Sequence, residues 1–284
     1  MKMSGAFSPA HKIVSLLFCF FIPSLALSQG NKNPAGVDEA TFNFVIHSVT
    51  NYFKPVLLGQ GDNLHVETFW KSSVINAFAR RLDSDVTLAF HGGLARLPGM
   101  DMATLALITC HEVGHLLGGA PFKDPKNFIS AEAQADYFAT SKCMRQIVKA
   151  IPEFTNLIPA IAPSASIQTK CFASFSSDLD QRICWLSASA SKNMLDALDK
   201  ATSHTPHPID FESPDPTVVT KTNSSYPSAQ CRLDTLIAGD LCQIDEHQLP
   251  DRTDENIGVC SSRNGDVIGL RPRCWFQDSS TFSG

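Results

Sequence analysis

The most regular hydrophobic pattern in the chain covers residues 102–117, where apolar side chains recur at helical spacing. Asp101 precedes this stretch as a candidate N-cap, and a pair of glycines followed by Pro121 ends it. A second helix is predicted from Ser130, as its N-cap, to about residue 148. Apolar spacing predicts two further helices, over residues 37–53 and about 179–201.

One short strand is predicted at residues 85–90, whose β-branched and apolar residues run into a turn at His91-Gly92-Gly93. Residues 205–227 hold five prolines, which predicts an extended loop. Residues 241–284 hold three cysteines among many turn formers, which favours a small disulfide-bound C-terminal extension. The expected fold class is therefore α+β and mainly helical, with a short β-sheet before the helix at residues 102–117.

The first 28 residues form a pattern of their own. Lys2 and Lys12 precede an apolar run at residues 13–27 that Pro23 interrupts, and Ala26-Leu27-Ser28 matches a small-x-small cleavage site. This order is typical of a secretory signal peptide. The alternative, a short membrane anchor, needs about 20 apolar residues and would have to tolerate the proline. We therefore expect an exported protein, periplasmic or secreted, with a bacterial envelope as the favoured setting.

Composition agrees with a globular exported domain. The chain has 284 residues, of which 43% are apolar, and this argues against a coiled coil, a collagen or a disordered protein. Removing residues 1–28 takes away two lysines and no acid, which leaves 21 − 28 = −7 formal charges and argues against nucleic-acid binding. Later segments are too short and polar to predict a membrane span.

Cysteine usage also changes on signal removal. The chain has nine cysteines, and Cys19 would leave with the signal. The remaining even number predicts disulfides in an exported chain. Eight cysteines permit 105 connectivities, so the pairing stays open at this stage.

The helix predicted at residues 102–117 contains His111-Glu112-Val113-Gly114-His115. Histidines at positions i and i+4 project from one helical face, so both imidazoles can reach one zinc ion. Catalytic zinc normally takes three protein ligands, and Glu132, in the first turn of the next predicted helix, supplies the third. Asp136, one turn later, is expected to accept the free N–H of a ligand histidine. Small residues would let the two helices approach closely, namely Ala131, Ala133 and Ala135.

Each of these residues also has a simpler interpretation. Glu132 and Asp136 at i and i+4 are what a solvated helical face would show, and Glu112 alone would be a surface charge. The position of Glu112 between two ligands favours a general base beside a metal site. Cys110 points about 100° away from the ligand face, so we expect it to be buried or disulfide-bonded.

Together these motifs resemble the gluzincin metallopeptidases, in particular the family of type I CAAX prenyl proteases and their soluble periplasmic relatives. Residues 86–94 are similar to that family's strand and glycine-containing turn, and residues 226–233 match its His-Pro…Arg pattern with Tyr226 in place of the histidine. The resemblance implies a zincin-like domain over residues 37–240. It also implies that Tyr226 replaces a histidine that stabilises the oxyanion, with three histidines as alternatives: His91, His204 and His207. The prenyl protease relatives span the membrane several times, so a lipidated substrate is not implied.

The function predicted from the sequence is an exported zinc-dependent endopeptidase acting on a protein or peptide substrate, with one Zn²⁺ per chain. The strand around residues 87–90 is expected to hold the substrate backbone by strand addition. Two other classes stay open. One is a zinc-holding binding or assembly factor of the cell envelope, whose latent site the loop at residues 205–227 or the tail covers. The other is an interaction module with a purely structural zinc. The oligomeric state is left open.

Overall fold

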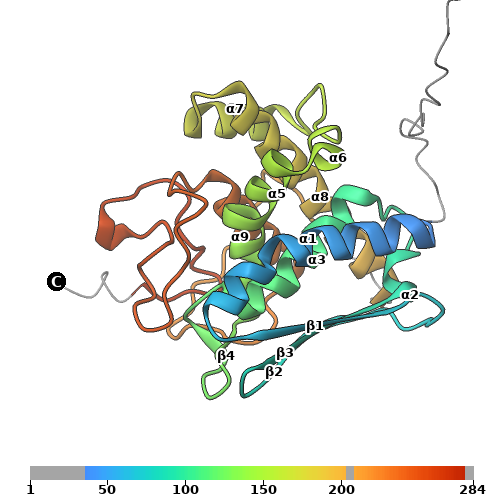
Figure 1. Cartoon of the computed structure of the whole chain (residues 1–284). Helices are drawn as coiled ribbons and strands as arrows, with labels where there is room; N and C mark the ends of the chain where they lie inside the picture. The colour runs from blue at the N-terminus through green and yellow to red at the C-terminus, as the bar shows by residue number, and fades with distance from the viewer. Residues whose placement is uncertain (1–35, 203–207, 279–284) are drawn as a thin grey trace, which may run out of the picture. The chain divides into compact units, whose positions relative to one another are not determined.

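Helix α3 (Met102–Leu117) is surrounded by the other elements of residues 36–202 and 208–278, the parts of the chain that the computed structural model describes (Figure 1). The side chain of Asp101 accepts a hydrogen bond from the Thr104 amide at 2.8 Å, which confirms the predicted N-cap. Every residue of α3 after Met102 is buried. A helix that is apolar on all sides is typical of the interior of a domain.

A three-stranded sheet packs one face against α1 and α3 (Figure 1). Its spatial order is β1-β3-β2, with β1 (Asn63–Phe69) parallel and β2 (Ala77–Leu82) antiparallel to β3 (Asp85–His91). The strand predicted at residues 85–90 is therefore confirmed, but it is the central strand. Substrate addition to residues 87–90 is wrong, because both of that strand's edges are already paired within the sheet.

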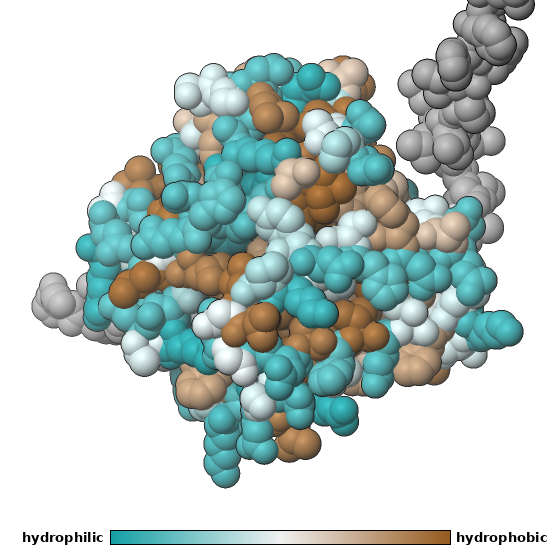
Figure 2. All heavy atoms as spheres, viewed as in Figure 1, coloured by the Kyte–Doolittle hydropathy of each residue, from teal (hydrophilic) through white to brown (hydrophobic). Residues whose placement is uncertain are grey.

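Helix α1 (Glu39–Gly59) covers the sheet and continues beyond the predicted residues 37–53. Asp38 caps it by accepting from the Thr41 amide at 2.7 Å. Pro55 lies inside the helix on its exposed side. On the face shown in Figure 2, hydrophobic residues gather in a band just below α1, between the helix and the strands.

The second predicted helix begins one residue later than expected. Helix α4 (Glu132–Phe138) has Ala131 at its N-cap, so the assignment of Ser130 as N-cap is wrong. Ser130 instead ends β5 (Ile129–Ser130), which pairs with β4 (Phe122–Asp124), and its hydroxyl donates to the Gly119 carbonyl at 2.7 Å. The helical path then continues through a π-helical segment, Ala139–Met144, into α5 (Arg145–Ala150).

The remaining helices pack around this core. The helix predicted at about residues 179–201 is confirmed as α8 (Asp178–Thr202). The sequence did not predict α6 (Pro152–Thr155), α7 (Ala165–Ser174), α9 (Ala229–Leu241) or the short 3-10 helix η2 (Ser262–Asn264). Residues 208–227 contain no helix or strand, as expected of the proline-rich loop predicted at residues 205–227. Residues 205–207 of that loop lie outside the described residues. The predicted signal peptide also lies outside them.

All eight cysteines that follow the predicted signal form disulfides, which confirms the expectation from their even number. The pairs are Cys110–Cys143, Cys171–Cys184, Cys231–Cys274 and Cys242–Cys260. Cys231–Cys274 attaches the C-terminal segment, residues 241–284, to α9, whereas Cys242–Cys260 lies within that segment. Trp275 in the segment is fully buried. No helix of residues 36–202 and 208–278 is long and apolar enough to cross a bilayer.

Candidate metal centre

Three buried side chains converge where the start of α4 meets α3. The Nε2 atoms of His111 and His115 lie 3.4 and 3.6 Å from Oε2 of Glu132. All three residues are at most 7% exposed. Ligands that sit about 2.0–2.1 Å from a tetrahedral ion are about 3.3 Å apart, so these separations fit a shared metal ion. Within the described part of the chain, this is the group that could hold a metal ion.

Each ligand histidine is oriented through its other ring nitrogen. Nδ1 of His111 donates to Oδ1 of Asp136 at 2.8 Å, and Nδ1 of His115 donates to the carbonyl oxygen of Ser130 at 2.9 Å. The carbonyl can only accept, so the proton of His115 resides on Nδ1 and the lone pair on Nε2. Both Nε2 atoms therefore face Glu132 and are available to a metal ion. The contact expected for Asp136 is present, whereas a main-chain carbonyl such as that of Ser130 has no signature in the sequence.

Two carboxylate oxygens at this centre lack a hydrogen-bond partner. They are Oε2 of Glu132, which faces the histidines, and Oε2 of Glu112, and both are buried. A buried polar atom left unpaired costs about 1–3 kcal/mol, and more when it is charged. A divalent cation would satisfy the oxygen of Glu132, so the residues fit a metal. Burial is the main cause that raises the pKa of Glu112, against the opposing charges of His111 and His115.

His111 has a strongly shifted pKa. Burial would lower it, yet the charge and hydrogen bond of Asp136, with smaller contributions from Glu132 and Glu112, raise the pKa of His111 to about 10. A metal ion that binds Nε2 therefore displaces a proton, which makes metal affinity depend on pH.

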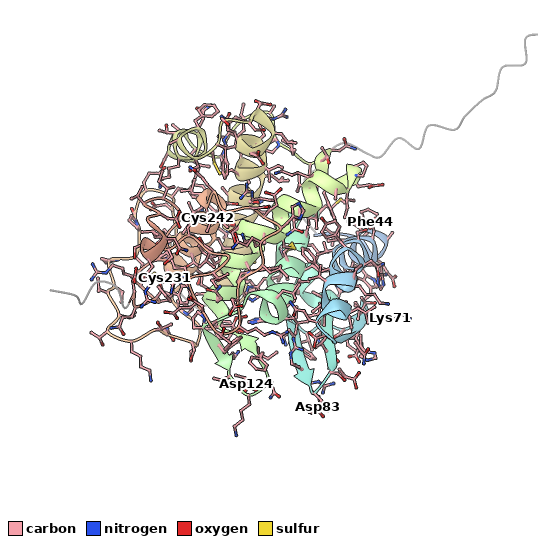
Figure 3. The ribbon with its side chains drawn as sticks, turned by 60° about the vertical axis from the view of Figure 1, so that its left-hand side comes forward. Phe44, Lys71, Asp83, Asp124, Cys231 and Cys242 are labelled. Carbon is pink, nitrogen blue, oxygen red and sulfur yellow. A yellow bond between two sulfur atoms is a disulfide. The ribbon has the colours of Figure 1, made fainter. Side chains whose placement is uncertain are left out.

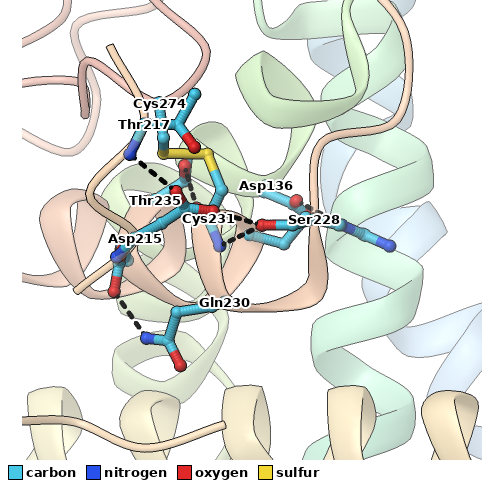
Figure 4. Close-up of a disulfide and its surroundings, with 10 residues drawn as sticks. Asp136, Asp215, Thr217, Ser228, Gln230, Cys231, Thr235 and Cys274 are labelled. Atoms are coloured by element: carbon cyan, nitrogen blue, oxygen red, sulfur yellow. Dashed lines mark hydrogen bonds and ion pairs between the residues drawn. A yellow bond between two sulfur atoms is a disulfide. The ribbon is translucent and has the colours of Figure 1, made fainter. Parts of the chain in front are cut away.

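Arg232 completes a chain of contacts behind His111. Its Nε and Nη2 atoms donate to the two oxygens of Asp136, both at 2.7 Å. Burial would raise the pKa of Asp136, but the charges of Arg232 and His111 hold it below the ordinary value. The sequence placed Arg232 in the matching motif without giving it a role. Close beside this contact, Figure 4 shows the start of α9, where Cys231 is bonded to Cys274 and Ser228 caps the helix.

Tyr226 lies at the same centre, brought there by the loop before α9. Its ring lies 5.1 Å from Nζ of Lys123 and 5.9 Å from Cζ of Arg232. Although Tyr226 is 65% exposed, partial burial of its hydroxyl and the negative charge and hydrogen bond of Glu132 raise its pKa to about 12. The hydroxyl therefore stays protonated at neutral pH. Of the alternative histidines, His91 contacts Ser72 at 3.0 Å and stacks on Phe69, away from the metal ligands. His204 and His207 lie outside the described residues.

Lys123 is a site residue that the sequence did not indicate. Its Nζ donates to Oε1 of Glu132 at 2.7 Å, the oxygen that does not face the histidines. The lysine side chain is 46% exposed while the Glu132 side chain is 1% exposed. Lys123 thus leaves Oε2 of Glu132 as the metal-facing oxygen. Nothing in the sequence marks this lysine, because its contact depends on the hairpin of β4 and β5.

The centre opens into a cleft of about 290 Å³. Strand β2 forms one wall and the β4–β5 hairpin another, with Glu112, His115 and Tyr226 among the lining residues. Figure 3 shows the β2–β3 hairpin, whose turn contains Asp83, beside the β4–β5 hairpin, which contains Asp124. The outer edge of β2 is not paired with another described strand. An extended chain can therefore reach the cleft along the edge of β2.

No family model matches the chain, and no curated protein or solved structure is similar to it. The resemblance to gluzincin peptidases therefore depends on the motif residues alone and stays a prediction.

Proposed function

We propose that the protein is an exported zinc-dependent endopeptidase of the gluzincin type, with a zincin-like fold. The observation that carries this proposal is the unpartnered buried carboxylate of Glu112 in the cleft beside the group His111, His115 and Glu132. A purely structural metal site has no use for a buried acid without a partner next to its ligands. The four disulfides support an oxidising compartment, as the proposed signal at residues 1–28 requires.

Zinc is the ion that two histidines and one glutamate suit best, and His111, His115 and Glu132 would hold it. When bound, the ion supplies Lewis-acid chemistry, polarising the substrate carbonyl and lowering the pKa of water. Glu112 accepts the proton of the attacking water and passes it to the leaving amine. Its raised pKa favours this second step, because a more basic carboxylate holds the proton until the amine takes it.

Tyr226 and β2 complete the proposed site. The protonated hydroxyl of Tyr226 donates a hydrogen bond to the carbonyl oxygen as negative charge develops there. The substrate backbone adds to the free edge of β2, in place of the central strand first considered. Asp136 and Arg232 hold His111 in the ring orientation that presents Nε2.

Replacing Glu112 with Gln tests this proposal. The purified mature chain is expected to keep close to one equivalent of zinc and to lose chelator-sensitive cleavage of casein, because the amide cannot accept the water's proton. Glu153→Gln, a half-buried glutamate in α6 away from the cleft, serves as the matched control and is expected to cleave as the wild type does. Full activity of the Glu112→Gln protein would contradict the proposed mechanism.

A further inference from the structure

Exposed apolar side chains gather beside one end of the cleft. We call the group Phe69, Val74, Ile75 and Phe78 the apolar rim, and each of its members is 37–50% exposed. Phe69 ends β1, Phe78 belongs to β2, and the other two lie in the connection between these strands. Clustered apolar side chains on a surface mark interaction sites more often than single ones do.

The connection that carries the rim is held in place. The guanidinium of Arg96 donates to the Ser72 carbonyl at 2.8 Å and lies 4.8 Å from the ring centre of Trp70. At Gly93, a Cβ atom would come within 2.4 Å of the carbonyl oxygens of Ser73 and Val74, so the loop rests directly on this glycine. A surface fixed in advance loses little conformational entropy on binding. The exposure of Val74 and Ile75 is therefore built into the fold.

The rim is continuous with the cleft. Phe78 belongs to both, since it also lines the cleft wall formed by β2. The carbonyl of Asn76 still accepts from the His91 amide at 3.1 Å, so the strand path extends one residue upstream of Ala77. At about 3.3 Å per residue, Ile75 lies about 10 Å from Phe78 along this path. An extended chain bound to the edge of β2 meets Ile75 and Val74 when it continues past Ala77.

We propose that the apolar rim binds the apolar part of an unfolded polypeptide substrate outside the cleft. This inference rests on the proposed peptidase function. Lys71 is the only charged residue between Trp70 and Phe78, so the rim favours uncharged apolar side chains. Such side chains are exposed in unfolded proteins and buried in folded ones, and this selects the substrate class.

The variant Val74→Ser/Ile75→Ser tests the rim, since both residues are exposed and the fold does not depend on them. Two substrates are compared on the zinc-loaded mature chain: reduced, alkylated casein and a five-residue peptide, which matches the five β2 residues that line the cleft. We expect KM for casein to rise about fivefold or more with kcat unchanged, and both constants for the peptide to stay at wild-type values. Ile161→Ser/Val267→Ser, at 79% and 85% exposure outside the cleft, is the matched control and is expected to match the wild type.

An unchanged KM for casein would overturn the proposal, as would an equal rise in KM for the short peptide. If the rim variant lost binding to phosphatidylglycerol vesicles while its KM for casein stayed unchanged, the rim would bind a lipid surface, and the proposal would also be overturned. Binding of labelled casein to the Glu112→Gln protein, with and without the rim substitutions, gives a readout that needs no turnover. If the wild type cleaves neither substrate, the proposed function fails. The casein-binding assay alone then tests whether the rim binds an unfolded polypeptide.

Discussion

At the scale of single residues, Tyr226 places a hydroxyl beside the candidate metal centre. The ring lies near the cations of Lys123 and Arg232, and the hydroxyl interacts with Glu132. A phenol that stays protonated is a hydrogen-bond donor, which is what a developing oxyanion needs. The position therefore has a donor beside the candidate metal centre, although the motif that the sequence resembles has a histidine there.

Tyr226→Phe removes only the hydroxyl. We expect kcat to fall about 100-fold with KM nearly unchanged, because the donated hydrogen bond strengthens in the transition state. Steady-state kinetics on a casein-derived peptide measure both constants. Tyr52→Phe, a half-buried tyrosine on α1, is the control. A Tyr226→Phe protein with a wild-type kcat would remove the hydroxyl from the mechanism.

Asp136 is the residue on which the orientation of His111 depends. Asp136→Asn is expected to weaken zinc binding about 10- to 100-fold, because a neutral amide is a poorer acceptor for the imidazole and no longer balances Arg232. Competition with a chromophoric chelator measures the affinity, with Asp178→Asn, whose side chain is 81% exposed, as the control. Equal affinities for the Asp136→Asn protein and the wild type would contradict the contact's role.

At the scale of elements, the site depends on how closely α3 and α4 approach. Three alanines of α4 and its N-cap were expected to allow this approach, and one of them, Ala135, makes the closest contact with Gly114 of α3. A Cβ atom at Gly114 would lie 2.7 Å from the Ala135 carbonyl oxygen and 3.0 Å from its Cα. The glycine inside the HExxH motif thus has a packing role besides its place between the ligands.

Gly114→Ala is expected to lower the free energy of unfolding by about 1–3 kcal/mol, since backbone must shift to accept the methyl group. Chemical denaturation of the zinc-loaded protein measures this change. Gly59→Ala is the matched control, because a Cβ there meets nothing within 4 Å and alanine is favoured in a helix. Equal free energies of unfolding for the two variants would show that the contact between α3 and α4 at Gly114 can accept a methyl group.

Elements also explain which predictions failed. Strand β1 was not predicted although residues 63–67 alternate polar and apolar side chains, whereas Arg80-Arg81 interrupts the hydrophobic pattern of β2. Arg81 is nonetheless buried and paired with Asp62, a contact between residues far apart in the sequence. Ser130 was predicted as an N-cap and not as the end of β5, because serine is common in turns, at strand ends and at N-caps.

At the scale of the whole molecule, the C-terminal segment reaches the metal centre through a disulfide. Cys231 precedes Arg232 in α9 and is bonded to Cys274, 43 residues later. Cys274 belongs to a buried cluster with Trp275 and with Ala133 of α4. The tail therefore fixes α9 against α4, and with it the contact between Arg232 and Asp136.

Cys231→Ser/Cys274→Ser is expected to lower the free energy of unfolding by about 4 kcal/mol, and Cys171→Ser/Cys184→Ser, which opens a 13-residue separation, by about 3 kcal/mol. Only the first pair is expected also to weaken zinc binding, because it alone adjoins Arg232. Denaturation curves and chelator competition on both variants measure the two effects. The same zinc affinity in the two variants would show that the Cys231–Cys274 disulfide does not support the metal centre.

The sequence by itself determined the parts of this protein whose cause is local. Helix α3 and its cap at Asp101, the strand at residues 85–90, helix α8 and the candidate metal group His111, His115 and Glu132 all follow from spacing along the chain. The fold class followed from the predicted elements, and the even number of bonded cysteines followed from composition. Local periodicity and helical geometry act over a few residues, so a single stretch of sequence contains them.

Only the tertiary structure decided which groups complete the site. The carbonyl of Ser130, the ammonium of Lys123, the guanidinium of Arg232 and the free edge of β2 reach it from separate parts of the chain. The disulfide pairing belongs here too, because sequence allowed many connectivities and the fold selected one. These contacts depend on which surfaces pack together, and packing is decided by the whole chain at once.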